Sequence, residues 1–197
     1  MPAIRRSARD GQDVGAAAPV LRVLGVDPGT VVLGWGVVDA RGGRLGRIAS
    51  GVLRWQGARA DRLAAICDAL LELCERYHPA MLSLEQTFVG DNVQSAFRLG
   101  EARGAVMVAA SRAGVGVAEY SPAQIKLAVA GSGRATKAQM QRMVGRLLAV
   151  DGALAADEAD ALGAAICHAH AGRSDTLLAA AAARGWGGRG RRTSWRR

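Results

Sequence analysis

Long apolar runs are missing from this chain of 197 residues. No stretch approaches the roughly 20 apolar residues that a membrane-spanning helix needs. Residues 1–19 also lack the uninterrupted apolar stretch of a signal peptide. The cysteines Cys67, Cys74 and Cys167 form no C-x-x-C pair, so neither a disulfide framework nor a zinc site is indicated. The sequence therefore predicts a cytoplasmic protein with no membrane segment.

Lysine is scarce, and the positive charge is unevenly spread. The chain has 24 arginines but two lysines, and its formal net charge is +9. Residues 172–197 carry seven arginines and one aspartate, and residues 1–19 carry three arginines and two aspartates, which leaves +2 for residues 20–171. The cationic end indicates either a polyanionic partner or a solvated segment that aids solubility. We expect a flexible extension over 1–19, one folded domain over 20–171 and a basic, disordered tail over 172–197.

The order of the predicted elements indicates a mixed α/β fold. Three β-rich segments at 21–27, 31–39 and 45–54 are separated by short turn signals, which predicts an antiparallel meander. Further elements follow in the order helix (58–77), strand (80–84), helix (92–113), strand (116–120), then helices that begin near 122, 136 and 157, the last ending near 171. This order predicts a mixed five-stranded sheet flanked by helices, as in ribonuclease H-like folds.

Four carboxylates are the candidate site. Asp27 and Glu85 each follow an apolar strand, and no lysine or arginine lies within two residues of either. A buried charge without a partner is costly, so each must be neutralised, pair with a base or hold a cation. Asp157 and Asp160 are three residues apart and share one helix face. Four converging carboxylates need a divalent cation, although Asp157 and Glu158 are also explained by capping of a helix N-terminus.

The carboxylates lie within an ordered series of short motifs. The series runs Val26-Asp27-Pro28-Gly29-Thr30 with Gly34-Trp35-Gly36, Leu84-Glu85-Gln86-Thr87-Phe88, Asn92, Ser95-Ala96, Leu99-Gly100, Ala102-Arg103-Gly104, and Asp157-Glu158-Ala159-Asp160-Ala161-Leu162 with His168 and His170. In order and spacing it resembles the RuvC family of Holliday junction resolvases over about residues 21–171. Asp91 departs from that pattern, since relatives usually carry a basic residue there.

The resemblance implies an activity, a cofactor and partners. It implies a homodimeric endonuclease of recombination and repair that binds four-way junction DNA and cuts two opposed strands symmetrically, leaving 5′-phosphate ends. Asp27, Glu85, Asp157 and Asp160 would be the catalytic metal ligands. They would hold two Mg²⁺ ions per subunit, for which Mn²⁺ can substitute. The branch-migration proteins RuvA and RuvB are the implied protein partners.

Three further residues are candidate DNA contacts. Lys126 and Lys137 match lysines of the family, and an ammonium group near a scissile phosphate is the role we expect for them; chance survival of two surface lysines is the alternative. Phe88 follows Glu85 and is expected to stack on an unpaired base, with local packing as its alternative. Phe97 lies inside a predicted helix and is expected in the core.

A stripe of small residues and two histidines are further features of the predicted helices. Ala96, Gly100 and Gly104 form a small-residue stripe that permits close helix contact, either within the monomer or across a dimer interface, and the resemblance favours the dimer. His168 lies about 16 Å along the helix axis from Asp157, too far to share a metal. We therefore expect His168 and His170 to be structural or solvated.

Three alternative functions would also account for parts of the sequence. The motif around Asp27 also occurs in the phosphate loop of actin-like sugar kinases, but those need two related domains and a second glycine-rich motif, for which this chain is too short. A catalytically inactive junction-binding protein would have lost a carboxylate, and none is lost. Another ribonuclease H-like nuclease remains the alternative within the same fold.

Overall fold

A computed structural model describes residues 19–86 and 93–183, with side chains up to residue 172. It contains five strands and five helices within those ranges. They are β1 (Leu21–Asp27), β2 (Val32–Arg41), β3 (Arg44–Arg54), α1 (Arg59–Tyr77), β4 (Met81–Glu85), α2 (Val93–Arg112), β5 (Gly116–Tyr120), α3 (Pro122–Ala130), α4 (Lys137–Leu147) and α5 (Ala156–Ala183). No helix among these residues is long and apolar enough to cross a membrane.

The strands form one mixed sheet in the order β3-β2-β1-β4-β5. β1, β2 and β3 pair antiparallel as a meander, because short turns connect them. β4 joins β1 in parallel, and β5 joins β4 in parallel, because a helix crosses over before each. The mixed α/β sheet of the ribonuclease H-like type is therefore confirmed.

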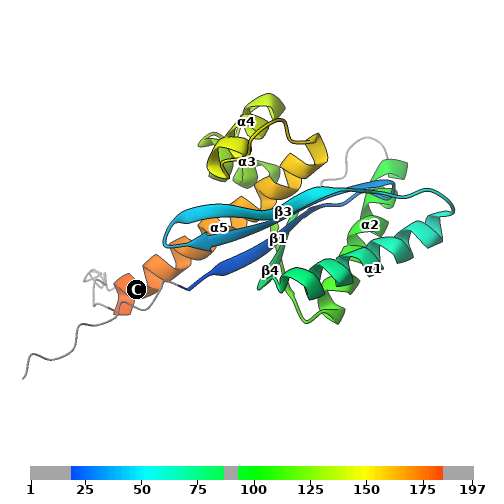
Figure 1. The fold of residues 1–197 in the computed structure, drawn as a ribbon, viewed down its shortest axis with the longest axis horizontal. Helices are drawn as coiled ribbons and strands as arrows, with labels where there is room; N and C mark the ends of the chain where they lie inside the picture. Colours follow the sequence, from blue (N-terminus) through cyan, green and yellow to red (C-terminus); the bar gives the residue numbers. More distant parts are fainter. Residues whose placement is uncertain (1–18, 87–92, 184–197) are drawn as a thin grey trace, which may run out of the picture.

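Helices cover both faces of the sheet (Figure 1). Alternate residues of β1 face opposite sides: Leu24 packs in the core beneath α1 and α2, while Val23 packs in the core beneath α3, α4 and α5. α5 lies across the middle of the sheet, where it contacts β1, β2 and β4. The side chains on this face at the ends of β1 and β4 therefore meet the beginning of α5.

Element bounds predicted from sequence agree within a few residues except at the end of α5. This helix was predicted to end near Ala171 and instead continues to Ala183. Part of the segment expected to be a disordered tail is thus helical. The helix continues because this stretch is rich in alanine and also contains Leu177 and Leu178. Alanine has the highest helix propensity, and leucine is among the next highest.

Candidate active site

Asp27 and Glu85 lie at the same edge of the sheet and on the same face. β1 and β4 are parallel neighbours, with Val26 paired to Leu84, so their carboxyl ends lie side by side. The face is identified by Ser83, whose Oγ donates a 2.8 Å hydrogen bond to the carbonyl oxygen of Ala164 on α5. Glu85, two residues later, belongs to the same face, as does Asp27 in its own strand. Both carboxylates are therefore placed beside α5.

Two glycines let the first turns of α5 lie directly on the sheet. A β-carbon at Gly25 would overlap the carbonyl oxygen of Ala161, and one at Gly34 would overlap the carbonyl oxygen of Asp157. Only glycine permits these approaches, since any side chain would push α5 away. The close packing carries Asp157 and Asp160 to the end of β1. All four predicted carboxylates are thus brought to one end of the sheet.

The carboxylates influence one another electrostatically. The pKa of Asp27 is raised to about 7, first by burial and then by Asp160, Asp157 and Glu85. The pKa of Glu85 is also raised, by desolvation first and by Asp160 second, although Glu85 is an exposed residue at the end of β4. Asp27 is therefore the central member of the cluster, since each of the other three carboxylates raises its pKa.

Both lysines of the folded domain lie beside this cluster. Lys137, the first residue of α4, places Nζ 3.1 Å from Asp160 Oδ2. This hydrogen bond is the main cause of the raised pKa of Lys137. Lys126 on α3 acts on Glu85 and lowers its pKa, opposing the effect of burial. Two lysine ammonium groups thus lie beside four carboxylates, which leaves the cluster with a net negative charge.

The composition of the cluster fits a hard divalent cation. Carboxylate oxygens are the preferred ligands of Mg²⁺, and mutual repulsion of this kind is relieved by a bound cation. Among the described residues, no three histidine, cysteine, aspartate or glutamate side chains are gathered closely enough to form a ready-made metal site. The four carboxylates are neighbours without converging, and Lys137 instead neutralises Asp160. The donor set therefore fits the metal, and these four carboxylates would hold it.

Glu158, which the sequence could explain by helix capping alone, fastens the first turn of α5 to the sheet. Its Oε1 accepts a 2.6 Å hydrogen bond from the Ser50 hydroxyl on β3. Ser50 in turn accepts a 2.8 Å hydrogen bond from Arg47. Oε2 lies 3.4 Å from the backbone nitrogen of Ala155, the glutamate half of a capping box. Glu158 therefore holds the turn that carries Asp157 in place.

Arg103 gives similar support to Glu85. Its Nη1 donates a 2.6 Å hydrogen bond to the backbone carbonyl of Glu85. Its Nη2 forms a 2.6 Å ion pair with Glu119 on β5. One arginine of α2 thereby links the ends of β4 and β5. Arg103 belongs to the motif Ala102-Arg103-Gly104, but its position in the sequence does not indicate this role.

The remaining predicted residues have mixed outcomes. Phe97 was expected in the core, and this prediction was wrong, because its side chain is 65% exposed on α2. His168 and His170 are structural, as expected: His168 Nδ1 lies 2.8 Å from the Tyr120 hydroxyl, and His170 Nδ1 lies 3.2 Å from the Ala128 carbonyl. Phe88 lies outside the described residues.

Comparison with known proteins identifies the family to which this chain belongs. A sequence profile of the family described as crossover junction endodeoxyribonuclease RuvC matches residues 23–168. The chain belongs to the RuvC family. The match includes all four carboxylates, both lysines and Glu158, so the whole cluster lies within the part shared with the family.

Individual proteins of the RuvC family are similar to this chain over most of its length. RuvC of Burkholderia vietnamiensis is 49% identical over 155 residues, which cover 78% of this chain and 86% of the relative. RuvC of Burkholderia multivorans is 47% identical over 159 residues, covering 80% and 88%. Thermus thermophilus RuvC, solved in complex with a Holliday junction substrate, superposes with a TM-score of 0.75 at 35% identity, covering 79% of this chain and 97% of that one. The yeast mitochondrial resolvase Ydc2, at 14% identity and a TM-score of 0.59, shares the fold.

Proposed function

We propose that this protein is a Holliday junction resolvase that hydrolyses phosphodiester bonds at Asp27, Glu85, Asp157 and Asp160. The observation that carries the proposal is the placement of these four carboxylates at one end of the sheet, where the three others all raise the pKa of Asp27. A nuclease of this family must hold cations beside a polyanion. A net negative cluster bordered by two lysines supports that task.

Each side chain has a proposed part in the reaction. Two divalent cations, Mg²⁺ or Mn²⁺, supply an activated water and relief of charge on the leaving oxygen when they are bound. Asp27, central in the cluster, would be the shared ligand. Glu85 would hold the leaving-group side, and Asp160 with Asp157 the water side. Lys137 would release Asp160 and turn toward the scissile phosphate, as an ammonium on a flexible stem can do.

Further DNA contacts are proposed around the cluster. Lys126 lies near Glu85 and would contact the backbone of the cut strand. Phe88 is proposed, from its position after Glu85 in the sequence, to stack on a base unpaired at the crossover. Together these contacts would favour a four-way junction over ordinary duplex DNA. They would act with the carboxylates in recombination and repair, beside RuvA and RuvB in the cytoplasm.

A homodimer is proposed through α2. The exposed apolar residues on this helix, 43 to 65% exposed, are Val93, Phe97, Met107 and Val108. A β-carbon at Gly100 or Gly104 would meet no atom within 4 Å, so the small-residue stripe is not packed within the monomer. A second copy would cover this face, and symmetric cutting of two strands needs two sites related by a twofold axis. The exposed position of Phe97 supports this arrangement.

Substitution of single carboxylates tests the proposed site. Asp27→Asn and Asp160→Asn remove a charged ligand and keep the side-chain volume, so each should abolish cleavage of a four-way junction while leaving junction binding close to wild type. Cleavage by gel assay and binding by fluorescence anisotropy measure the two separately. Near-normal turnover in either variant would show that the metal ligands are assigned incorrectly.

A further inference from the structure

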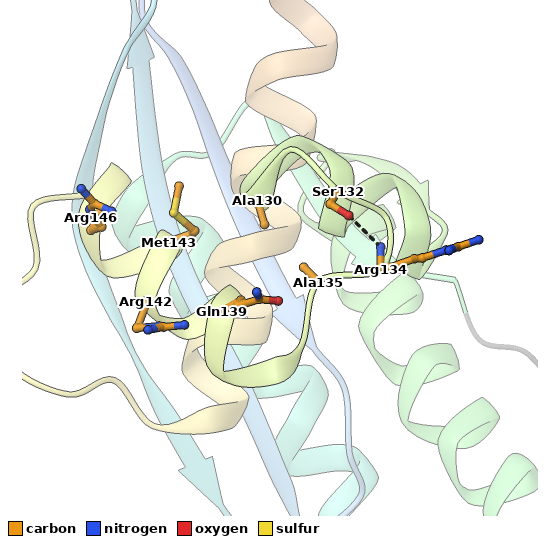
Figure 2. Close-up of a pocket in the computed structure, with 8 residues that line it drawn as sticks. All are labelled: Ala130, Ser132, Arg134, Ala135, Gln139, Arg142, Met143 and Arg146. Atoms are coloured by element: carbon orange, nitrogen blue, oxygen red, sulfur yellow. Dashed lines mark hydrogen bonds between the residues drawn. The ribbon is translucent and has the colours of Figure 1, made fainter.

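A basic hollow lies on the outer side of α4, apart from the carboxylate cluster. Its volume is about 510 Å³. Its polar side chains are those of Ser132, Arg134, Gln139, Arg142 and Arg146. Figure 2 shows that the arginines come from two segments, since Arg142 and Arg146 belong to α4 and Arg134 to the loop before it. We refer to this feature as the arginine hollow.

The structure of α4 separates the hollow from the core. Met140 and Val144 are buried against α3 and α5, and they define the inner side of the helix. Arg142 and Arg146 are one turn apart and lie on the outer side. Like charges at this spacing on a helix repel one another. The pair is thus held together at some cost.

No anionic side chain offsets this charge. The residues that line the arginine hollow include no aspartate or glutamate. Asp151 borders a neighbouring hollow that Arg142 and Arg146 also line. Within the described part of the chain, neither it nor any other acidic residue forms an ion pair with Arg134, Arg142 or Arg146. These three arginines are therefore not neutralised by an ion pair within the described part of the chain, and they leave this surface positively charged.

The groups available in the hollow are hydrogen-bond donors. Each guanidinium has five N–H donors and no acceptor. Gln139 Oε1 already accepts a hydrogen bond from the backbone N–H of Thr136, so the amide nitrogen of Gln139 is the part left to bind a ligand. Ser132 Oγ accepts from the backbone N–H of Arg134, and its own hydrogen stays available to donate. A ligand with several anionic oxygens matches this set.

The spread of the arginines favours an extended ligand. Arg134 extends away from Arg142 and Arg146 in Figure 2, so the three charges border a broad surface instead of meeting at one point. A small anion would satisfy one guanidinium at a time. A nucleic-acid backbone presents a charge every 3.4 Å along each strand and can satisfy all three. The two α4 arginines are separated by about 6 Å of helix rise, roughly two of these intervals, so they can reach different phosphates of one strand.

We propose that the arginine hollow binds the phosphodiester backbone of a junction arm, outside the cleavage site. This inference rests on the proposed function, because it assigns a second contact to the same substrate. α4 begins at Lys137, which pairs with Asp160 of the carboxylate cluster. Arg142 and Arg146 lie roughly 7.5 and 13.5 Å further along the helix axis. A duplex arm leaving the cleavage point beside α4 brings successive phosphates past them.

The test compares two variants that each lose two positive charges. Arg142→Gln/Arg146→Gln removes charge from the hollow. Arg41→Gln/Arg44→Gln removes the same charge from the exposed turn between β2 and β3, and these two arginines form no ion pair among the described residues. Junction affinity is measured by fluorescence anisotropy across a range of NaCl concentrations, and the melting temperature of each variant confirms that it is folded.

The hollow variant should reduce the slope of log affinity against log salt by about 1 to 2, since each lost phosphate contact contributes roughly 0.9. The turn variant should keep the wild-type slope. Single-turnover cleavage at saturating protein should stay at the wild-type rate in both, because the carboxylates and Lys137 are intact. Both variants are measured over the same salt range with a mobile junction and with a linear duplex.

Either of two results would overturn the inference. An unchanged slope in the hollow variant would mean that the arginines serve another partner, such as an acidic protein surface. Equal losses in both variants would mean that general positive charge, and not the hollow, attracts the DNA. Failure of the proposed function looks different, because the wild-type protein would then bind the junction without cutting it in Mg²⁺, and the comparison of slopes would still be readable.

Discussion

The Ser50 hydroxyl on β3 donates a 2.6 Å hydrogen bond to Glu158 Oε1 in the first turn of α5. The two residues are 108 positions apart in the sequence. Because Glu158 lies between Asp157 and Asp160, this contact fixes the turn that presents two of the four carboxylates. Removal of residues that position metal ligands without contacting the metal commonly lowers metal affinity by about 10- to 100-fold.

Loss of this hydrogen bond should weaken metal binding. Ser50→Ala leaves the charge of the site unchanged, and we expect it to lower Mn²⁺ affinity by about 10-fold and stability by about 1 kcal/mol. Glu158→Gln keeps an acceptor for Ser50 but loses a negative charge, so comparing the two variants separates orientation from electrostatics. Mn²⁺ affinity is read from the electron paramagnetic resonance signal of free Mn²⁺. Wild-type affinity in Ser50→Ala would show that the contact does not position the site.

Metal affinity should depend on pH through Asp27. Its carboxyl group has a pKa of about 7 in the metal-free protein, so below that pH a proton must leave before a cation binds. Apparent Mn²⁺ affinity should therefore fall as pH drops from about 7 to about 6 and level off above about 8. Calorimetry in buffers of different ionisation enthalpy should detect proton release on binding at the lower pH and little at the higher. Affinity that is constant over this range would contradict the raised pKa.

The same carboxylate should destabilise the metal-free fold. The pKa of Asp27 is raised from 3.8 to about 7 on folding, so the folded state binds the proton more tightly, and stability is lost as pH rises between these values. Asp27→Asn lacks the charge. In a chelator at about pH 8 the variant should be more stable than wild type by on the order of 1 kcal/mol or more, which raises the melting temperature by about 2 to 4 °C per kcal/mol.

The comparison at acidic pH is the control. Near pH 4 the wild-type carboxyl is largely protonated in the folded state, so the advantage of Asp27→Asn should disappear. Mg²⁺ should raise the melting temperature of the wild-type protein more than that of the variant, because a bound ligand stabilises the folded state. A variant that melts below wild type in chelator at the higher pH would show that Asp27 is not under electrostatic strain.

The strand-end carboxylates could be predicted because the signal is local. An apolar strand followed directly by Asp27 or Glu85 places each side chain at a sheet edge, and the spacing of Asp157 and Asp160 places both on one helix face. The structure adds the reason why they are neighbours, which is the parallel pairing of β1 with β4 and the close approach of α5 over Gly25. Those glycines could not be interpreted until the helix was known to cross them.

Contacts between distant segments could not be predicted from the sequence. Nothing near Ser50 indicates that it meets Glu158, because the pairing depends on where β3 and α5 lie in space. Phe97 was misplaced for a related reason: apolar periodicity shows that a helix has an apolar face, but α2 has one face packed on α1 and another left exposed. Only the packing of the whole domain decides which residue belongs to which face.

Cleavage of three labelled substrates by the purified protein tests the central claim most directly. A mobile four-way junction, a linear duplex and an RNA–DNA hybrid are each incubated with and without Mg²⁺, and the products are mapped at nucleotide resolution. The proposed function predicts paired, symmetric and ligatable nicks in the junction only when Mg²⁺ is present, with little cutting of the other two. Equal cutting of hybrid and junction, or junction cutting that persists in chelator, would contradict it.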